Sequence, residues 1–277
     1  MGVNDRVDEV LVRFLLDRRA ELAGMDPDAA ALADEIVRIV EAGGKRIRPA
    51  LCVWAFRAAG GADADERILR AGAAIELLHT SALVHDDLMD RDVERRGEPA
   101  THVRFAKEAP AGVDPDGFGT AAAVLVGDLA LVLSERLMRT SGFGVERLEA
   151  AMTRFDRMRA EMAAGQFLDV SGSERRDRVR ALKTGSYTAE GPVLIGAALA
   201  GAEPAAEGPL RVYGRLLGEA FQLRDDVLDD APDAVGAAEI DELLSRAARS
   251  LEEAPLRREG VDALVAIANA LRMGAAG

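Results

Sequence analysis

Apolar residues recur along most of the chain at intervals of three and four positions, the spacing that gathers them on one face of an α-helix. The alternating pattern of a half-buried strand is absent, and aromatic residues, which strands favour, make up only 4% of the sequence. Prolines and glycine pairs stand mostly where the apolar pattern lapses, so they mark helix boundaries. The pattern predicts helices over residues 4–23, 28–42, 49–59, 65–90, 118–140, 146–170, 176–200 with a break, 208–230, 237–253 and 258–272.

The longest expected loop covers residues 91–117, which are polar and include three prolines. No internal repeat, low-complexity tract or linker divides the sequence, so we expect one all-α domain over residues 1–277. A helical bundle of this size must bury at least one helix on all sides. Residues 65–90, 118–134 and 187–200 are the candidates, because their apolar residues spread around the helix.

Composition narrows the classes of partner and compartment. Acidic residues outnumber basic ones by 48 to 35, which gives a formal net charge of −13 and argues against a nucleic-acid partner. The single cysteine, Cys52, excludes an internal disulfide and fits a reducing cytoplasm. The longest uncharged stretch, residues 191–202, is too short to cross a bilayer, and the acidic start of the chain is unlike a signal peptide. We therefore expect a soluble cytoplasmic protein without a transmembrane segment.

Two mainly apolar helices end in carboxylates, IELLHTSALVHDDLMDRD at 75–92 and FQLRDDVLDD at 221–230. Their aspartates are Asp86, Asp87 and Asp90 in the first segment and Asp225, Asp226 and Asp229 in the second. Residues four apart share a helix face, so each segment presents a pair of like charges that weakens the helix and opposes its dipole. A cation would offset these costs, and an all-oxygen donor set favours Mg²⁺. The alternative is that each cluster is a solvated acidic helix end.

Basic residues follow at fixed offsets from these segments. GGKRIRP at 43–49 places three cations beside a glycine turn and a helix start, an arrangement that suits a diphosphate. The alternative is that the segment is an ordinary basic turn on the surface. Arg95 and Arg96 follow the first acidic segment, and arginine can grip phosphate oxygens in a bidentate fork. His79 lies two turns before Asp86 on the same helix face, and alone it would read as a buried core histidine.

Taken together, GGKRIRP, HTSALVHDDLMDRDVERRG, GDLAL, GQFLD, KTGSYT and FQLRDDVLDD resemble the trans-isoprenyl diphosphate synthase family. The motifs follow the family's order over about residues 40–230, and the ordered set is far more specific than any single motif. The resemblance implies an orthogonal all-α bundle of the isoprenoid synthase type, a central active-site cavity between the two acidic motifs, and a homodimer. It also implies head-to-tail condensation of isopentenyl diphosphate with an allylic diphosphate, which would be dimethylallyl, geranyl or farnesyl diphosphate.

The same resemblance assigns roles to individual residues. The diphosphate of isopentenyl diphosphate would be held by Lys45, Arg48, His79 and Arg96. Three Mg²⁺ ions would be coordinated by Asp86, Asp90 and Asp225, with Asp87, Asp226 and Asp229 in support. The allylic diphosphate would be contacted by Arg95, Lys183 and Gln222, with Thr184 close by.

Product length would depend on the residues just before the first acidic motif, where the family stops the growing chain. Ser81 and Ala82 are small there, so the tunnel is expected to continue towards Leu78. We favour geranylgeranyl diphosphate, with a longer polyprenyl diphosphate as the rival product.

The sequence departs from the family after the second acidic motif. No lysine follows Lys183, although the family carries a glycine–lysine loop and a further lysine there, and the segment between Gln166 and Lys183 is short. Either these segments are shortened in the protein, which would weaken closure over the diphosphate, or the sequence as written omits loop residues. We favour the second, because both gaps fall where family members carry lid-like segments.

Two other functions remain open at this point. A class I terpene cyclase shares the bundle and the first acidic motif, but its second metal motif is absent and GGKRIRP would serve no purpose in it. A non-catalytic partner subunit of a prenyl synthase is supported only by the missing lysines, because both aspartate motifs are intact.

Overall fold

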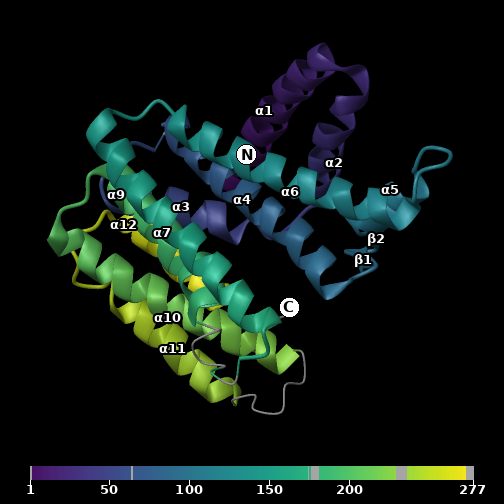
Figure 1. Cartoon of the computed structure of the whole chain (residues 1–277). Coiled ribbons are helices and arrows are strands. Elements are labelled where there is room, and N and C mark those ends of the chain that lie inside the picture. The colour runs from purple at the N-terminus through teal and green to yellow at the C-terminus, as the bar shows by residue number, and fades with distance from the viewer. Residues whose placement is uncertain (1, 64, 174, 176–180, 229–235, 273–277) are drawn as a thin grey trace. The chain divides into compact units, whose positions relative to one another are not determined.

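The computed structural model describes residues 2–63, 65–173, 175, 181–228 and 236–272, apart from the side chains of residues 181 and 183–185. Helices make up nearly all of its regular structure (Figure 1). In chain order the elements are α1 (Val3–Met25), η1 (Pro27–Ala29), α2 (Ala30–Glu41), α3 (Ile47–Ala58), α4 (Glu66–Asp90), β1 (Glu94–Arg95), β2 (Glu98–Pro99), α5 (Thr101–Lys107), α6 (Pro115–Arg139), α7 (Val145–Val170), η2 (Ala181–Glu190, a π-helix), α9 (Gly191–Ala200), α10 (Pro204–Leu228), α11 (Ala237–Arg249) and α12 (Arg258–Ala270).

The expected all-α class is confirmed, with two local corrections. Residues 91–117 were expected to be a loop, but they contain the short antiparallel hairpin β1–β2 and the seven-residue helix α5. Pro209 does not mark a boundary, because it lies within the first two turns of α10, which begins at Pro204. Pro209 has no N–H to donate to the carbonyl oxygen four residues earlier, so α10 continues past it without that one hydrogen bond.

Contacts between Cα atoms divide the chain into two compact units. Unit 1 comprises Met1–Arg46 and Leu69–Ser141, and unit 2 comprises Ile47–Ile68 and Gly142–Gly277. The expectation of one domain over residues 1–277 stays a prediction.

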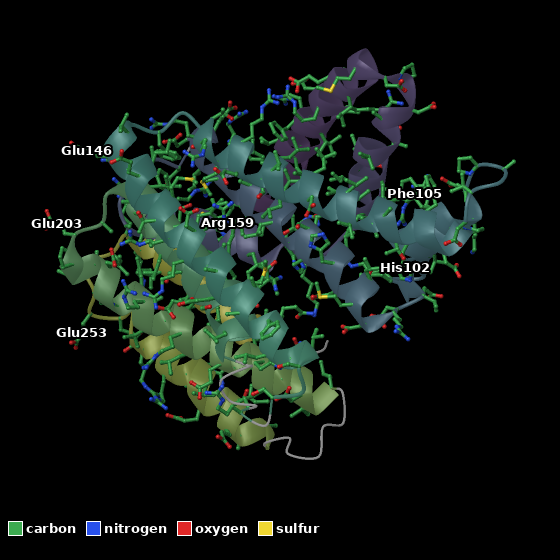
Figure 2. The ribbon with its side chains drawn as sticks, in the orientation of Figure 1. His102, Phe105, Glu146, Arg159, Glu203 and Glu253 are labelled. Atoms are coloured by element: carbon green, nitrogen blue, oxygen red, sulfur yellow. The ribbon has the colours of Figure 1, made fainter. Side chains whose placement is uncertain are left out.

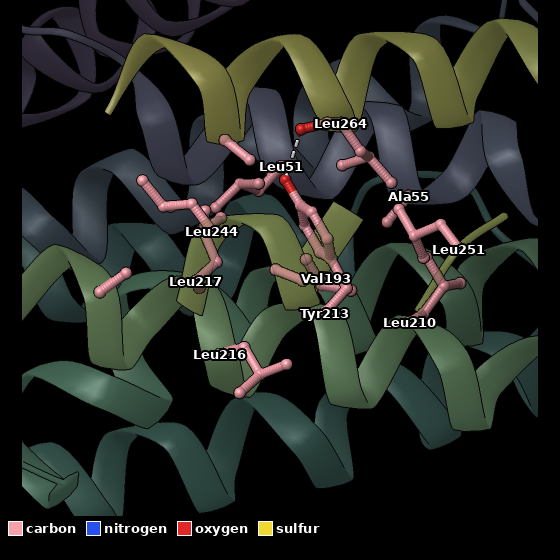
Figure 3. Close-up of a cluster of buried hydrophobic side chains, with 14 of the residues drawn as sticks. Leu51, Ala55, Val193, Leu210, Tyr213, Leu216, Leu217, Leu244, Leu251 and Leu264 are labelled. Carbon is pink, nitrogen blue, oxygen red and sulfur yellow. Dashed lines mark hydrogen bonds between the residues drawn. The ribbon is translucent and has the colours of Figure 1, made fainter. Parts of the chain in front are cut away.

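The core of unit 2 gathers side chains from α3, α9, α10, α11 and α12 (Figure 3). Tyr213 is fully buried there, and its hydroxyl donates a hydrogen bond of 2.6 Å to the Leu264 carbonyl oxygen, so its one polar atom is satisfied. Helix α9 lies against α3 so closely that a Cβ at Gly196 would stand 2.1 Å from the Cys52 carbonyl oxygen. Cys52 itself is fully buried, and this burial raises the pKa of its thiol.

In unit 1, α5 and α2 pack against α6. His102 and Phe105 lie on α5, where Figure 2 labels them, and the Phe105 ring meets the Phe118 ring of α6 edge-on at 6.2 Å. The prediction of helices buried on all sides is confirmed for residues 71–78 of α4 and, in unit 2, for residues 192–199 of α9.

The same prediction is wrong for α6, which has an exposed apolar face. Val124, Leu125 and Val132 are 41%, 54% and 63% exposed. Within the part of the chain that the structure describes, α6 is also the one helix long and apolar enough to cross a membrane, and 44% of that apolar window is buried. Core helices pass the same test, so the expected absence of a transmembrane segment stays a prediction.

Candidate active site

The first acidic motif ends α4, and its three carboxylates have different surroundings. Asp87 is buried, with 4% of its surface exposed, Asp86 is half-buried and Asp90 is exposed. Asp86 and Asp90 are four residues apart in one helix and therefore project from one face. The motif thus separates into one enclosed carboxylate and two more accessible ones.

Asp87 has a cation of its own. The Arg95 guanidinium, on β1, donates a short hydrogen bond from Nε to the Asp87 carboxylate and lies 3.4 Å from Asp92. Burial raises the pKa of the Asp87 carboxyl, and the neighbouring Arg95 charge opposes that rise. Asp87 therefore positions Arg95. The supporting role expected for Asp87 beside Asp86 and Asp90 stays a prediction.

The glycine turn at 43–46 corrects one expectation. Arg46 was counted among three cations suited to a diphosphate, but its side chain is buried and ion-paired. Its Nη1 lies 2.7 Å from Glu76, its Nε 2.7 Å from Asp8, and its Nη2 donates to the Val40 carbonyl oxygen at 2.6 Å. Burial opposes the charge on Arg46, but the attraction of Glu76 and Asp8 raises its pKa. Arg46 therefore holds the turn in place, and Lys45 is the exposed cation of the turn in unit 1.

Arg96 lies against this same turn. Its Nη1 donates a short hydrogen bond to the Gly43 carbonyl oxygen, and it adopts a left-handed φ of 56°. Gly43 has a φ of 87°, a conformation that glycine adopts without a steric penalty. Partial burial lowers the pKa of Arg96, and the Arg46 charge lowers it further. Unit 1 thus brings Arg96 together with the turn that carries Lys45. Their shared phosphate role stays a prediction.

The expected chain-length floor lies inside α4. Ser81 is 3% exposed and Leu78 is fully buried, whereas Ala82 and His79 are half-buried. All four residues precede the carboxylates in α4, and two of them are enclosed by the core.

The second acidic motif ends α10 in unit 2. The Gln222 side-chain amide donates a hydrogen bond of 2.8 Å to the Asp226 carboxylate, four residues further along the helix. Asp225 and Asp226 are half-buried. Asp229 lies outside the described residues, and Lys183 and Thr184 lie in η2 with side chains outside the described part.

Arg48 belongs to unit 2 and has two neighbours from one segment. Its guanidinium lies 4.5 Å from the centre of the Tyr187 ring, and its Nη2 donates to the Thr188 hydroxyl at 3.1 Å. Its Nε is buried and has no hydrogen-bond partner among the described residues. Tyr187 was not singled out from the sequence, although it is one of only two tyrosines and lies within KTGSYT. Stacking on an aromatic ring fixes the guanidinium plane while leaving N–H groups for a ligand.

Unit 2 also contains a pocket of about 650 Å³ between α7, η2, α9 and α10. Gln222 lines it, together with the apolar side chains Met158, Leu194 and Leu223. Ion-paired side chains line it as well, among them Arg157 with Glu161 at 2.8 Å. The pocket size is in the range of small-molecule sites.

The donor chemistry of the first motif fits magnesium. Mg²⁺ in proteins usually takes one or two carboxylates and completes its shell with water and substrate phosphate. Asp86 and Asp90 supply two carboxylates on one helix face. Among the described residues no three His, Cys, Asp or Glu side chains gather into a site that could hold a metal by themselves.

Comparison with known proteins shows the family of the chain. The polyprenyl synthetase family model matches residues 29–236. A geranylgeranyl diphosphate synthase of Methanosarcina mazei is 36% identical over 206 residues, covering 71% of this chain and 58% of that protein. A short chain isoprenyl diphosphate synthase of Methanothermobacter thermautotrophicus is 33% identical over 222 residues, covering 78% and 62%. The chain therefore spans about three-fifths of the length of these relatives.

Solved structures show the same fold. The geranylgeranyl pyrophosphate synthase of Corynebacterium glutamicum, complexed with isoprenyl diphosphate and magnesium, has a TM-score of 0.88 at 25% identity, covering 98% of this chain and 99% of that one. The geranylgeranyl pyrophosphate synthetase of the archaeon Geoglobus acetivorans has a TM-score of 0.79 at 24% identity, covering 98% and 99%. Because the family model matches three-quarters of this chain, the chain belongs to the polyprenyl synthetase family.

Proposed function

We propose that the protein is a trans-prenyltransferase that condenses isopentenyl diphosphate with an allylic diphosphate and releases diphosphate. The observation that carries this proposal is the arrangement at the end of α4. There, paired carboxylates, the Arg95 guanidinium and the turn held by Arg96 occupy one region of unit 1. A chain that only folded an allylic diphosphate on itself would not need a second diphosphate-binding turn.

The allylic diphosphate is assigned to the two acidic motifs. Asp86 and Asp90 in unit 1, and Asp225 and Asp229 in unit 2, would hold magnesium, with three ions expected when diphosphate is bound. When bound, the metal supplies the positive charge that draws electrons from the leaving group. Arg95, Lys183 and Gln222 would contact the same diphosphate.

Isopentenyl diphosphate is assigned to the turn and its neighbours. Lys45 and Arg96 in unit 1 would hold its phosphates through charge-assisted hydrogen bonds. Arg48 would add a guanidinium fixed by the Tyr187 ring, and His79 would complete the set.

The reaction needs little covalent work from the protein. The bond between the allylic carbon and its diphosphate breaks, and fixed cations beside the leaving group lower the barrier to that step. The double bond of isopentenyl diphosphate attacks the allylic carbocation, which forms the new carbon–carbon bond and a second cation. Loss of a proton to the released diphosphate then regenerates a double bond. Apolar walls would keep water from the cation.

The product is assigned as geranylgeranyl diphosphate or a longer polyprenyl diphosphate. Ser81 and Ala82 are too small to stop a chain at their level, and Leu78 follows one turn deeper in α4. The relatives include a geranylfarnesyl diphosphate synthase of Aeropyrum pernix, 33% identical over 207 residues, so a five-unit product belongs in the same range.

A homodimer in the cytoplasm completes the proposal. The exposed face of α6 carries Val124, Leu125 and Val132, and a second copy of the chain would cover it. A Leu125→Arg substitution should then shift the sedimentation coefficient towards that of a monomer. An unchanged coefficient would assign the α6 face to another role.

One assay tests the activity and separates it from its rivals. The protein is incubated with Mg²⁺, radiolabelled isopentenyl diphosphate and farnesyl diphosphate, and the products are sized by chromatography. Labelled prenyl diphosphate longer than farnesyl diphosphate supports the proposal. Hydrocarbon formed from farnesyl diphosphate alone would indicate a cyclase, and no product would indicate a non-catalytic subunit.

A further inference from the structure

A buried ion-pair network in unit 1 supports the hairpin that carries Arg95 and Arg96. Its centre is Glu35 on α2, whose side chain is fully buried. The carboxylate accepts hydrogen bonds from Arg38 Nε at 2.8 Å and Nη2 at 2.7 Å, from the Thr101 hydroxyl at 2.8 Å, and a short one from Arg104. Burial opposes ionisation of Glu35, yet these donors hold its pKa below the ordinary value. The carboxylate is therefore charged and fully engaged.

Arg38 links this network to the hairpin. Its Nη2 also donates to the Pro99 carbonyl oxygen at 3.2 Å, and Pro99 lies on β2. Strand β2 pairs with β1 in a register that places Pro99 opposite Glu94 and Glu98 opposite Arg95. Arg38 thus contacts the strand next to the one that presents Arg95.

Helix α2 holds the hairpin at a second point. The residues that follow its C-terminus form the glycine turn, where the Gly43 carbonyl oxygen accepts the bond from Arg96. A cavity of about 20 Å³, room for about one water, lies between the two points and has Arg38, Asp87, Arg95 and Arg96 in its wall. The four side chains therefore surround one small space.

We propose that Arg38 is a positioning residue, which holds the β1–β2 hairpin against α2 so that Arg95 and Arg96 reach the substrate diphosphates. This inference rests on the proposed function, because it needs both arginines to bind diphosphate. Two-residue strands cannot hold a hairpin by themselves, so an external anchor is required. Glu35 fixes the Arg38 guanidinium in a bidentate pair, and the carbonyl bond passes that fixed geometry to β2.

The chain offers a matched control for the test. Arg38 and Arg104 both bind Glu35, but among the described contacts only Arg38 also reaches the hairpin. We compare Arg38→Met with Arg104→Met, which each remove one guanidinium from the same carboxylate. Arg38→Lys is the conservative variant, because it keeps the charge and can reach one of the two partners.

The expected result is a split between KM and kcat. Arg38→Met should raise KM for isopentenyl diphosphate and for the allylic diphosphate about tenfold each and leave kcat within about threefold. A KM change of this size corresponds to loss of one charged hydrogen bond. Both methionine variants should lower the melting temperature by similar amounts, because each removes one guanidinium from the same carboxylate. Arg104→Met should nevertheless leave KM within about twofold of wild type. Arg38→Lys should reverse part of the rise in KM. An unchanged KM in Arg38→Met, or an equal rise in Arg104→Met, would overturn the inference.

A binding measurement separates this inference from the proposed function. Isothermal titration with inorganic pyrophosphate and MgCl₂ measures affinity without turnover. Arg38→Met should weaken pyrophosphate binding about tenfold relative to wild type and to Arg104→Met, the ratio expected from the KM change. That result would support the inference even if wild type makes no prenyl product, which would overturn only the proposed function. Equal pyrophosphate affinities in all three proteins would overturn the inference alone.

Discussion

The two acidic motifs have the same spacing of aspartates but different support. At the end of α4, Asp87 is buried and paired with Arg95, which comes from a separate hairpin. At the end of α10, the corresponding Asp226 is half-buried and accepts a hydrogen bond from Gln222 in its own helix. The first motif thus has a cation brought in by tertiary structure, whereas the Gln222 contact of the second motif comes from its own helix. Equal motifs in sequence therefore do not imply equal roles for each aspartate.

The largest expected effect comes from the aspartates assigned to magnesium. Asp86→Ala and Asp225→Ala should each lower kcat by at least about 10²-fold, because charge at the leaving group would be lost. Circular dichroism should show an unchanged helix content in both. Turnover within a few-fold of wild type in either variant would remove that motif from the proposed site.

A second effect concerns Glu35, the centre of the ion-pair network that supports the hairpin next to the first motif. Glu35→Gln should lower the free energy of unfolding at pH 7 by about 3 kcal/mol, because two arginines lose a buried partner. Since the pKa of Glu35 is held below its ordinary value, this stabilisation is present above that value and is lost as the pH falls through the lowered one. Denaturation at several pH values should therefore show the gap to wild type narrowing in acid. A gap independent of pH would exclude Glu35 ionisation as its cause.

The helices before the two motifs provide a third comparison. Ser81 stands five residues before Asp86 and Ala220 five before Asp225, and both are buried. Ser81→Phe should shorten the product, because a ring would block the proposed tunnel. Ala220→Phe should leave product length unchanged and instead destabilise the core of unit 2 by about 1–3 kcal/mol through overpacking. Chromatography of the products and thermal melts distinguish the two, and a shift in product length from Ala220→Phe alone would place the tunnel elsewhere.

The smallest effect concerns the partners of Asp87 and Asp226. Arg95→Met should lower the free energy of unfolding by about 1–3 kcal/mol, since it leaves a buried carboxylate without its cation. Gln222→Met should change it by less than about 0.5 kcal/mol, the value of a single contact within a helix. Urea denaturation measures both. Equal losses would mean that the two motifs are supported alike.

Sequence alone predicts the long helices well, because each repeats the helical period over several turns. The prediction fails at residues 91–117, where strands of two residues and a helix of seven are too short to show a period. It also fails for α6, whose apolar residues cover both a buried and an exposed face. Apolar character alone does not say whether a face meets the core or solvent.

Sequence also predicts only some of the basic residues of the candidate site. Motifs identified Lys45, Arg95 and Arg96 as candidates, and Arg96 does lie on the turn that carries Lys45. Arg46 could not be separated from its neighbours, because its ion pairs depend on Asp8 and Glu76, which are distant in sequence. Glu35 and Arg38 were missed for a different reason, since an acid and a base three apart are ordinary on any helix.

The buried thiol of Cys52 has a practical consequence for experiments on this protein. Reagents such as maleimides attack the thiolate, which burial makes scarce, so they should label the native chain only when unit 2 opens. The rate of labelling would then report that opening directly. Because the chain has one cysteine, a thiol introduced at an exposed position could carry a fluorophore with little background from Cys52.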